Sequence, residues 1–137
     1  MRPDEAFLSH SSQDREMAER IAHALQEHGI PTFFAPSNLL GAQQWQDEIL
    51  LALDRCDWFL VLVSPDAVDS MWVRRETSMA LSDRRFDKRI VPLFYRSCDL
   101  DTLRWLRVYQ FVDFQGDFHA GCRDLLRIWG VGLKASP

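Results

Sequence analysis

The segment SMWVRRE, residues 70–76, holds the residues of this sequence best suited to chemistry. Trp72 and Glu76 are four positions apart, so on a helix they share one face, one turn above the other. An aromatic ring and a carboxylate in this arrangement can form the wall of a small pocket. An ordinary glycosidase needs a second carboxylate to protonate the departing alkoxide, so a lone acid suits a leaving group that departs without a proton. The alternative interpretation is a surface glutamate paired with Arg74, Arg75 or another neighbour.

The residues that follow the predicted strands argue against several common kinds of active site. No glycine-rich phosphate loop follows the first strand, and the sequence has no G-x-S-x-G turn, so dinucleotide dehydrogenases, P-loop enzymes and α/β-hydrolases are disfavoured. A phosphoacceptor receiver domain needs acidic residues after its first strand and an aspartate at the end of its third. Here those places hold Ser9, His10 and Ser64, which disfavours a receiver domain too.

Strand and helix patterns alternate along the chain and predict the elements that position these residues. The predicted strands are residues 5–9, 32–35, 58–63, 90–95 and 110–112. The run WFLVLV at 58–63 is apolar on both faces, as a central parallel strand requires. The predicted helices run from the caps at 11–14 to residue 28, over 45–53, from 69–70 to about 83, and over 118–129, with helical turns at 64–66 and 103–106. Pro92 indicates a position near the sheet edge or a bulge.

This alternation predicts an α/β fold: a flavodoxin-like, doubly wound, five-stranded parallel sheet in the order 2-1-3-4-5, with helices on both faces. Ligands of such sheets bind outside the carboxyl ends of the strands. We therefore expect the loops after the first three strands to border one cleft, with the Glu76 carboxylate reachable by solvent. The residues expected at this cleft are Ser9, Gly41, Trp45, Ser64, Trp72 and Glu76.

The composition is that of a single soluble globular domain. The chain has 137 residues, of which 47% are hydrophobic and 26% are charged. Its formal net charge of −4 gives no general attraction for nucleic acid or a membrane, and neither is an expected partner. Cys56, Cys98 and Cys122 are widely spaced and form no metal-ligand pattern, which predicts no metal site and a cytoplasmic location. We expect one domain over residues 4–130, and over 131–137 a tail or the start of a linker to a further partner domain.

Several segments together resemble the TIR (Toll/interleukin-1 receptor-like) domain family, in particular its bacterial-type members. They are DEAFLSH at 4–10, FF at 33–34 with LLG at 39–41 and Trp45, LVLVSP at 60–65 with Ser70, Trp72 and Glu76, and IVPL at 90–93. This ordered set extends from about residue 4 to residue 128, nearly the whole chain. The resemblance of 90–93 to the fourth strand of the family accounts for Pro92.

The resemblance implies two classes of function. Some TIR domains hydrolyse NAD to nicotinamide and ADP-ribose or a cyclic form of it, whereas others are non-catalytic modules for homotypic interaction. In the enzymatic members the catalytic glutamate follows the tryptophan by four residues, which implies Glu76 here. Nicotinamide leaves NAD as a neutral molecule, so Glu76 needs only to bind the ribose hydroxyls and stabilise the cationic transition state. The enzymatic class is therefore preferred, as a signalling or defence effector with NAD as substrate and no cofactor.

The resemblance also implies a substrate-binding set and a surface for self-association. The implied substrate-binding residues are Ser9, His10, Ser11, Gly41, Trp45, Ser64 and Trp72, without a metal ligand. This sequence has serines where some enzymatic members carry basic residues, so amides at the start of the first helix are expected to bind the phosphates. The so-called BB loop, here Pro36 to Gln44, is expected to pack against another TIR copy. The choice between a linear and a cyclic product, the activating signal and the oligomeric form are left open.

Overall fold

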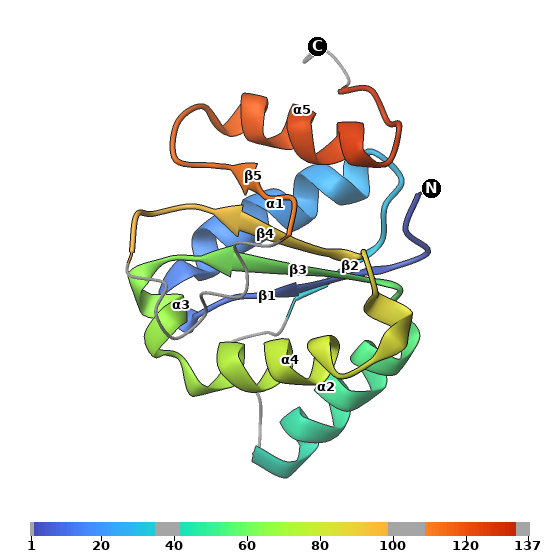
Figure 1. Cartoon of the computed structure of the whole chain (residues 1–137), viewed down its shortest axis with the longest axis vertical. Helices are drawn as coiled ribbons and strands as arrows, with labels where there is room; N and C mark the ends of the chain where they lie inside the picture. The colour runs from blue at the N-terminus through green and yellow to red at the C-terminus, as the bar shows by residue number, and fades with distance from the viewer. Residues whose placement is uncertain (1, 35–41, 99–108, 134–137) are drawn as a thin grey trace.

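The computed structural model describes residues 2–34, 42–98 and 109–133, and for residues 42–46 it describes the backbone alone (Figure 1). In chain order the elements are β1 (Ala6–Ser9), the 3₁₀ turn η1 (Ser12–Asp14), α1 (Arg15–Glu27), β2 (Thr32–Phe34), α2 (Ala42–Arg55), β3 (Trp58–Val63), α3 (Pro65–Asp69), α4 (Met71–Leu81), the 3₁₀ turn η2 (Arg84–Phe86), β4 (Ile90–Phe94), β5 (Val112–Asp113) and α5 (Phe118–Ile128). Within these ranges, no helix combines the length and the apolar character that crossing a membrane requires.

The strands form one sheet in the order β2-β1-β3-β4-β5, and each neighbouring pair is parallel. The predicted flavodoxin-like topology is therefore confirmed. β1 and β3 are buried along their whole length, which explains why neither alternates polar and apolar residues. The strand order reverses between β1 and β3, so the carboxyl ends of these two strands form the edge at which such sheets bind ligands.

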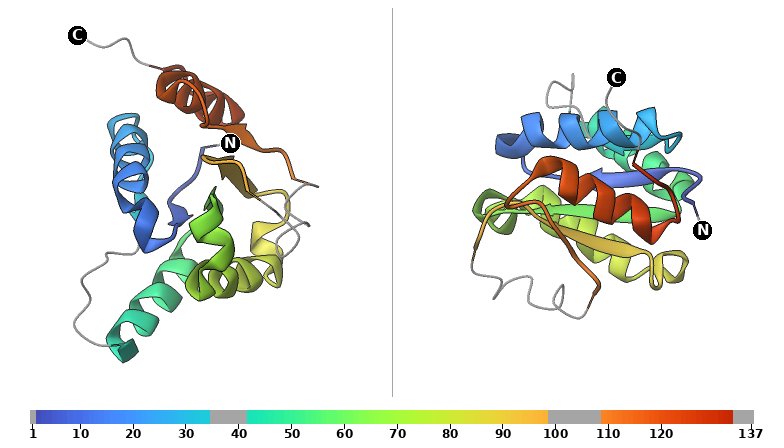
Figure 2. Two further views of the ribbon diagram at one scale, coloured as in Figure 1. Left: turned by 90° about the vertical axis from the view of Figure 1, so that its left-hand side faces the viewer. Right: turned by 90° about the horizontal axis from the view of Figure 1, so that it is seen from above.

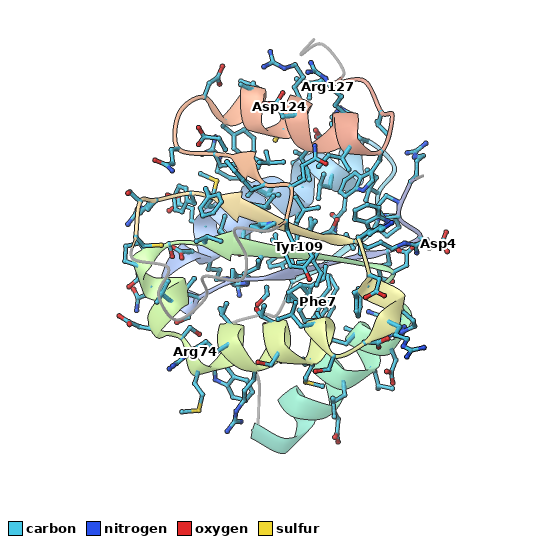
Figure 3. All side chains as sticks on the ribbon, viewed as in Figure 1. Asp4, Phe7, Arg74, Tyr109, Asp124 and Arg127 are labelled. Atoms are coloured by element: carbon cyan, nitrogen blue, oxygen red, sulfur yellow. The ribbon has the colours of Figure 1, made fainter. Side chains whose placement is uncertain are left out.

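Helices cover both faces of the sheet, α1 and α5 on one face and α2 and α4 on the other (Figure 1, Figure 2). Alternate residues of a strand point to opposite faces, so Leu60 belongs to the core under α1 and α5, and Val61 to the core under α2 and α4. Phe7 points from β1 into the α2 and α4 layer (Figure 3) and stacks on Phe59, with 5.5 Å between ring centroids. Glu76 lies in this second layer, on α4.

Several element boundaries differ from the predicted ones. α2 begins at Ala42, earlier than Trp45, and α4 ends at Leu81 rather than near Asp83. β5 begins at Val112, not at residue 110. The turn predicted at 64–66 is a separate short helix, α3. The turn predicted at 103–106 lies outside the described residues.

Pro92 lies inside β4, which has a neighbouring strand on each side. The ladder between β4 and β5 begins only at Leu93. The Phe94 carbonyl accepts a hydrogen bond from the Phe114 N–H on the β5 side. Pro92, two residues earlier, faces the same side before that ladder begins, so its missing N–H leaves no ladder hydrogen bond unmade. The position has the character of an edge, as the proline indicated.

Serine caps determine where α3 and α4, the two helices that follow β3 in the chain, begin. Ser64 directly follows β3, and its Oγ accepts a hydrogen bond of 3.0 Å from the Ala67 N–H at the start of α3. Ser70 caps α4 in the same manner, accepting from the Val73 N–H at 3.3 Å. Each cap satisfies an N–H that a helix leaves without an internal partner. Together they bring the second turn of α4, and with it Glu76, beside the carboxyl end of the sheet.

Candidate functional site

The carboxylate of Glu76 is bound to the end of the central strand β1. Ser9, the last residue of β1, donates a hydrogen bond of 2.6 Å from its Oγ to Glu76 Oε1. These residues are 67 positions apart in the sequence, and the fold joins them because α4 packs beside β1 and β3. Within the described residues this is the one hydrogen bond to the Glu76 side chain. Two members of the predicted site are therefore in direct contact.

Glu76 is more buried than the sequence led us to expect. The residue is only 3% exposed, which corrects the expectation of a carboxylate open to solvent. Burial raises its pKa to about 7, because removal from water disfavours the charged form, and the hydrogen bond from Ser9 opposes that rise. No cation of the described residues contributes to this pKa shift. The alternative interpretation, a surface glutamate paired with Arg74 or Arg75, is therefore wrong.

Glu76 nevertheless borders open space, a cavity of about 230 Å³ between α2 and α4. The lining residues are Ile49, Leu50, Trp72, Arg75, Glu76 and Met79. Those contributed by α4 follow the spacing i, i+3, i+4, i+7, which is one stripe along a helix. Trp72 and Glu76 form part of the wall, as their spacing indicated. Arg75 and Met79 were missed, although the same spacing identifies them, because a cation and a methionine did not suggest a pocket.

Arg75 lies against the tryptophan of the cavity wall. Its guanidinium carbon is 5.7 Å from the centroid of the Trp72 ring, within the range of a cation–π contact. Ion pairs of the described residues engage other arginines, such as Arg55 with Glu5 at 2.8 Å, but none of them involves Arg75. The cavity therefore combines apolar walls with one buried carboxylate and one cation near its mouth.

His10 and Ser11 follow β1 directly and connect it to η1 at the carboxyl end of the strand. The His10 Nδ1 lies 2.8 Å from the Ser11 carbonyl oxygen, and its ring centroid is 6.0 Å from that of Phe34 on β2. The Ser11 Oγ accepts from the Gln13 N–H at 3.1 Å and so caps η1. Both residues are largely buried at the switch point, and neither lines the cavity beside Glu76.

Ser64 takes part in a second buried pair that sequence reasoning missed. Its Oγ donates a short hydrogen bond to Asp14 Oδ2 while it accepts from the Ala67 N–H. Ser64 is fully buried and Asp14 nearly so, and neither residue lines the cavity that Glu76 borders. Asp14 appeared in the sequence as an ordinary acid at the start of a helix. No local signal shows that it meets a serine 50 positions later.

The remaining predicted site residues cannot be compared with the cavity. Gly41 lies outside the described residues, as does most of the loop from Pro36 to Gln44. Trp45 belongs to the first turns of α2, where the backbone alone is described. In the part of the chain that is described, no three histidine, cysteine or acidic side chains are grouped as a metal site would require.

Solved structures of two TIR domains resemble this fold. The TIR domain of the Toll-related receptor TRR-2 from Hydra magnipapillata superposes with a TM-score of 0.69 and 21% identity, over 90% of this chain and 95% of that one. The TIR domains of the activated Roq1 resistosome superpose with a TM-score of 0.71 and 18% identity, over 91% and 98% of the two chains. At these identities the likeness concerns the fold alone. No curated protein sequence matches the chain.

The family comparison agrees with the fold. The sequence model of the TIR domain matches residues 6–126, from the first residue of β1 almost to the end of α5. Apart from Asp4 and Glu5, this match covers the segments whose resemblance was noted from the sequence, including Ser9 at the end of β1 and the helix that carries Trp72 and Glu76. The chain therefore belongs to the TIR domain family of signalling modules.

Proposed function

We propose that this TIR domain is a cytoplasmic NAD glycohydrolase, which cleaves the bond between nicotinamide and ribose and acts as a signalling or defence effector. One observation carries the proposal: Glu76, nearly buried and hydrogen-bonded by Ser9, lines a cavity together with Trp72 of the same helix. A buried carboxylate without an ion-pair partner is costly for folding. Such costs are concentrated at functional sites.

The chemistry of the cavity suits a cationic transition state. As the glycosidic C–N bond breaks, nicotinamide keeps the electron pair and leaves neutral, and positive charge develops on the ribosyl carbon. The Glu76 carboxylate stabilises that charge in a site with little water, where electrostatic interactions are strongest. Water then adds to the ribosyl carbon and loses one proton to solution, which completes hydrolysis to ADP-ribose. Attack by a group of the same substrate instead of water gives the cyclic product.

The hydrogen bond from Ser9 has two effects in this scheme. It holds Oε1 in one position, and it favours the charged form of Glu76 against the effect of burial. With a pKa of about 7, a part of Glu76 is protonated at neutral pH in the free protein. The pyridinium of NAD carries a positive charge, so a bound substrate itself favours the ionised carboxylate. Substrate binding thus prepares the catalytic group.

Concentrated protein incubated with NAD provides the test. We expect free nicotinamide to appear in step with the loss of NAD, together with ADP-ribose or its cyclic form, as separated by chromatography. Glu76→Gln should remove most of this activity while the protein remains folded. Release of nicotinamide at equal rates by the parent and by folded Glu76→Gln would contradict the role of Glu76.

A second candidate function is a non-catalytic module for association with other TIR domains. It is favoured by exposed apolar residues on α2 and α4, two of which line the cavity, Leu50 and Met79, and two of which do not, Leu51 and Met71. The Roq1 TIR domains, which share the fold, were solved in an activated resistosome that recognises a pathogen effector. Contact through the loop from Pro36 to Gln44 stays a prediction, because the loop lies largely outside the described residues.

The two candidates differ in what they require of Glu76. A module that only associates releases no nicotinamide, and its association is unchanged in Glu76→Gln. A catalytic domain that also associates gains activity per molecule as protein concentration rises. Sedimentation velocity of Leu51→Asp, whose side chain is 63% exposed, tests association independently, because this change leaves the cavity lining intact.

A further inference from the structure

Arg75 occupies a special position beside the candidate catalytic residue. It is the immediate neighbour of Glu76 on α4, and both line the same cavity. Glu76 is almost entirely buried, whereas Arg75 is exposed. Of these two neighbouring cavity residues, the acid is thus buried and the cation is exposed to solvent.

The guanidinium of Arg75 is oriented by an aromatic surface. Its guanidinium carbon lies 5.7 Å from the Trp72 centroid, and no hydrogen bond to another described residue occupies its N–H groups. An arginine in this arrangement keeps its planar set of donors available and loses less conformational freedom on binding an anion. Contact with Trp72 thus prepares Arg75 to bind a ligand of the cavity.

The charge of Arg75 is not compensated by a carboxylate of the described residues. Some other arginines are compensated, such as Arg55 by Glu5, Arg85 by Asp83 at 2.9 Å and Arg15 by Glu19 at 2.9 Å. Arg75 is in no ion pair of the described residues, and neither is its neighbour Arg74, which does not line the cavity. Glu76, the nearest acid in sequence, has its pKa shifted by burial and by Ser9, with no contribution from Arg75. An uncompensated cation at the mouth of a cavity attracts an anionic ligand.

The phosphate position expected from the sequence is less suitable. Amides at the start of the first helix were expected to hold the phosphates of the substrate. In the structure α1 is preceded by Asp14, an acidic side chain that is buried at that end of the helix. A carboxylate at this point offsets the positive electrostatic potential of the helix N-terminus, which would otherwise attract a phosphate.

We infer that Arg75 binds a phosphate of the substrate, and that the site consequently selects a phosphorylated nucleotide over an uncharged nucleoside. The inference rests on the proposed function for the orientation of the substrate, with the nicotinamide and its ribose at Glu76. The diphosphate that follows this ribose is then directed to the mouth of the cavity. Guanidinium and phosphate form paired, charge-assisted hydrogen bonds, which an ammonium reproduces in charge but not in geometry.

Arg74 supplies a matched control. It lies on the same helix one position earlier (Figure 3), is also exposed, and is not part of the cavity lining. Arg74→Gln and Arg75→Gln therefore remove the same charge from the same helix and change the net charge of the protein equally. A difference in ligand affinity between the two variants is therefore due to the position of Arg75 at the cavity. Equal thermal unfolding curves establish that both variants are folded.

Calorimetric titration with ADP-ribose, which contains the diphosphate and lacks the scissile bond, tests the inference without turnover. We expect Arg75→Gln to bind about tenfold more weakly than the parent, Arg75→Lys to fall between them, and Arg74→Gln to match the parent. Adenosine, which has no phosphate, should bind weakly and equally to the parent and both Gln variants. Equal ADP-ribose affinity in Arg75→Gln and Arg74→Gln, or no binding to the parent, would overturn the inference.

The proposal that the protein hydrolyses NAD can be disproved independently of the phosphate contact at Arg75. A parent protein that releases no nicotinamide from NAD, yet binds ADP-ribose in an Arg75-dependent way, contradicts the hydrolase and supports the phosphate contact. In an active parent, Arg75→Gln should raise KM for NAD and leave kcat nearly unchanged, because a phosphate contact is present in both ground state and transition state. A lowered kcat at constant KM would instead indicate that Arg75 only positions Trp72, and would overturn the inference.

Discussion

Two buried serine–carboxylate pairs lie at the carboxyl edge of the sheet, one at Ser9 and Glu76 and the other at Ser64 and Asp14. In each pair a serine at the end of a central strand donates its hydroxyl to an acid on a helical element, Ser9 to Glu76 on α4 and Ser64 to Asp14 on η1. The degree of burial is similar, since all four residues are at most 3% exposed. The chemical groups are the same, so any difference in what the pairs do must come from their surroundings.

The surroundings differ in available space and in backbone partners. Glu76 borders a cavity of about 230 Å³, and its oxygen Oε1 is held by Ser9. Ser64 accepts from the Ala67 N–H in addition to its bond with Asp14, and the Asp14 N–H donates to the Ser11 carbonyl oxygen at 2.9 Å. The second pair thus joins η1 to α3 through caps and turns. We propose that the first pair presents an acid to a ligand, whereas the second pair holds η1 and α3 together.

The comparison shows that a buried acid is a candidate for catalysis only where open space adjoins it. A polar pair that also completes backbone hydrogen bonds is explained by the stability of the fold. Asp14 and Glu76 are therefore expected to respond to substitution in opposite ways. Variants of the four residues test whether the two pairs differ in this way.

The largest difference should appear in the rate of NAD cleavage. Glu76→Gln removes the charge and keeps the shape, so we expect nicotinamide release to fall by about a hundredfold to a thousandfold, the scale seen when one preorganised electrostatic group is lost. Asp14→Asn, which can still accept from Ser64, should keep the rate within about threefold of the parent. Steady-state rates at pH 8 for both variants provide the measurement. A larger loss in Asp14→Asn than in Glu76→Gln would reverse the assignment of the two pairs.

The stability of the parent should depend on pH through Glu76. Its pKa is about 7 in the folded protein and 4.5 for an ordinary glutamate, so between these values the folded state binds more protons than the unfolded state. The stabilisation that the raised pKa of Glu76 gives the folded state is fully present below pH 4.5 and is lost as pH rises through about 7. We expect a loss of about 3 kcal/mol over this window, measured as the free energy of unfolding in urea.

Comparison with Glu76→Gln separates the part of the pH dependence of stability that comes from Glu76. The amide cannot ionise, so the variant should be more stable than the parent above pH 7 and should lack this component of the pH dependence. Asp14→Asn, in contrast, should retain the component, because Glu76 is intact. Equal pH dependence in the parent and in Glu76→Gln would show that the Glu76 carboxyl group does not titrate in this range.

Removing the serine of the structural pair should destabilise the protein. Ser64→Ala leaves the buried Asp14 side chain without its donor and α3 without its cap, which we expect to cost about 2 kcal/mol or more. Urea unfolding at pH 8, with the slope of the transition compared between variants, gives this value. A loss below about 0.5 kcal/mol would mean that the caps and the pair contribute little to the fold.

The smallest expected effect belongs to the serine of the functional pair. Ser9→Ala removes the hydrogen bond that lowers the Glu76 pKa, so the pKa should rise above about 7. We expect kcat/KM at pH 7 to fall by about three- to tenfold and the difference from the parent to narrow as pH increases. If the kcat/KM values of Ser9→Ala are lower than those of the parent by the same factor at every pH, Ser9 positions Glu76 without changing its pKa.

Local patterns in the sequence determined most of the fold. The apolar run of β3 and the caps at Ser64 and Ser70 depend on residues close in sequence, and the structure has the corresponding elements and the predicted strand order. The placement of Trp72 and Glu76 on one wall follows from the period of a helix. These features could be predicted because a strand run, a cap and a helical stripe each require information from a few neighbouring residues.

Only the tertiary structure decided which polar groups meet and how deeply they are buried. The sequence allowed Glu76 to be a surface residue paired with an arginine, whereas packing of α4 against β1 places it against Ser9. The same packing placed Glu76 at the wall of a cavity and Asp14 in a buried pair with Ser64, although both acids lie near the start of a helix. Contacts between residues 50 or 67 positions apart depend on strand order and register, and burial depends on every element that surrounds a side chain. A local sequence pattern predicts neither these contacts nor the burial, because both depend on how all the elements of the fold pack together.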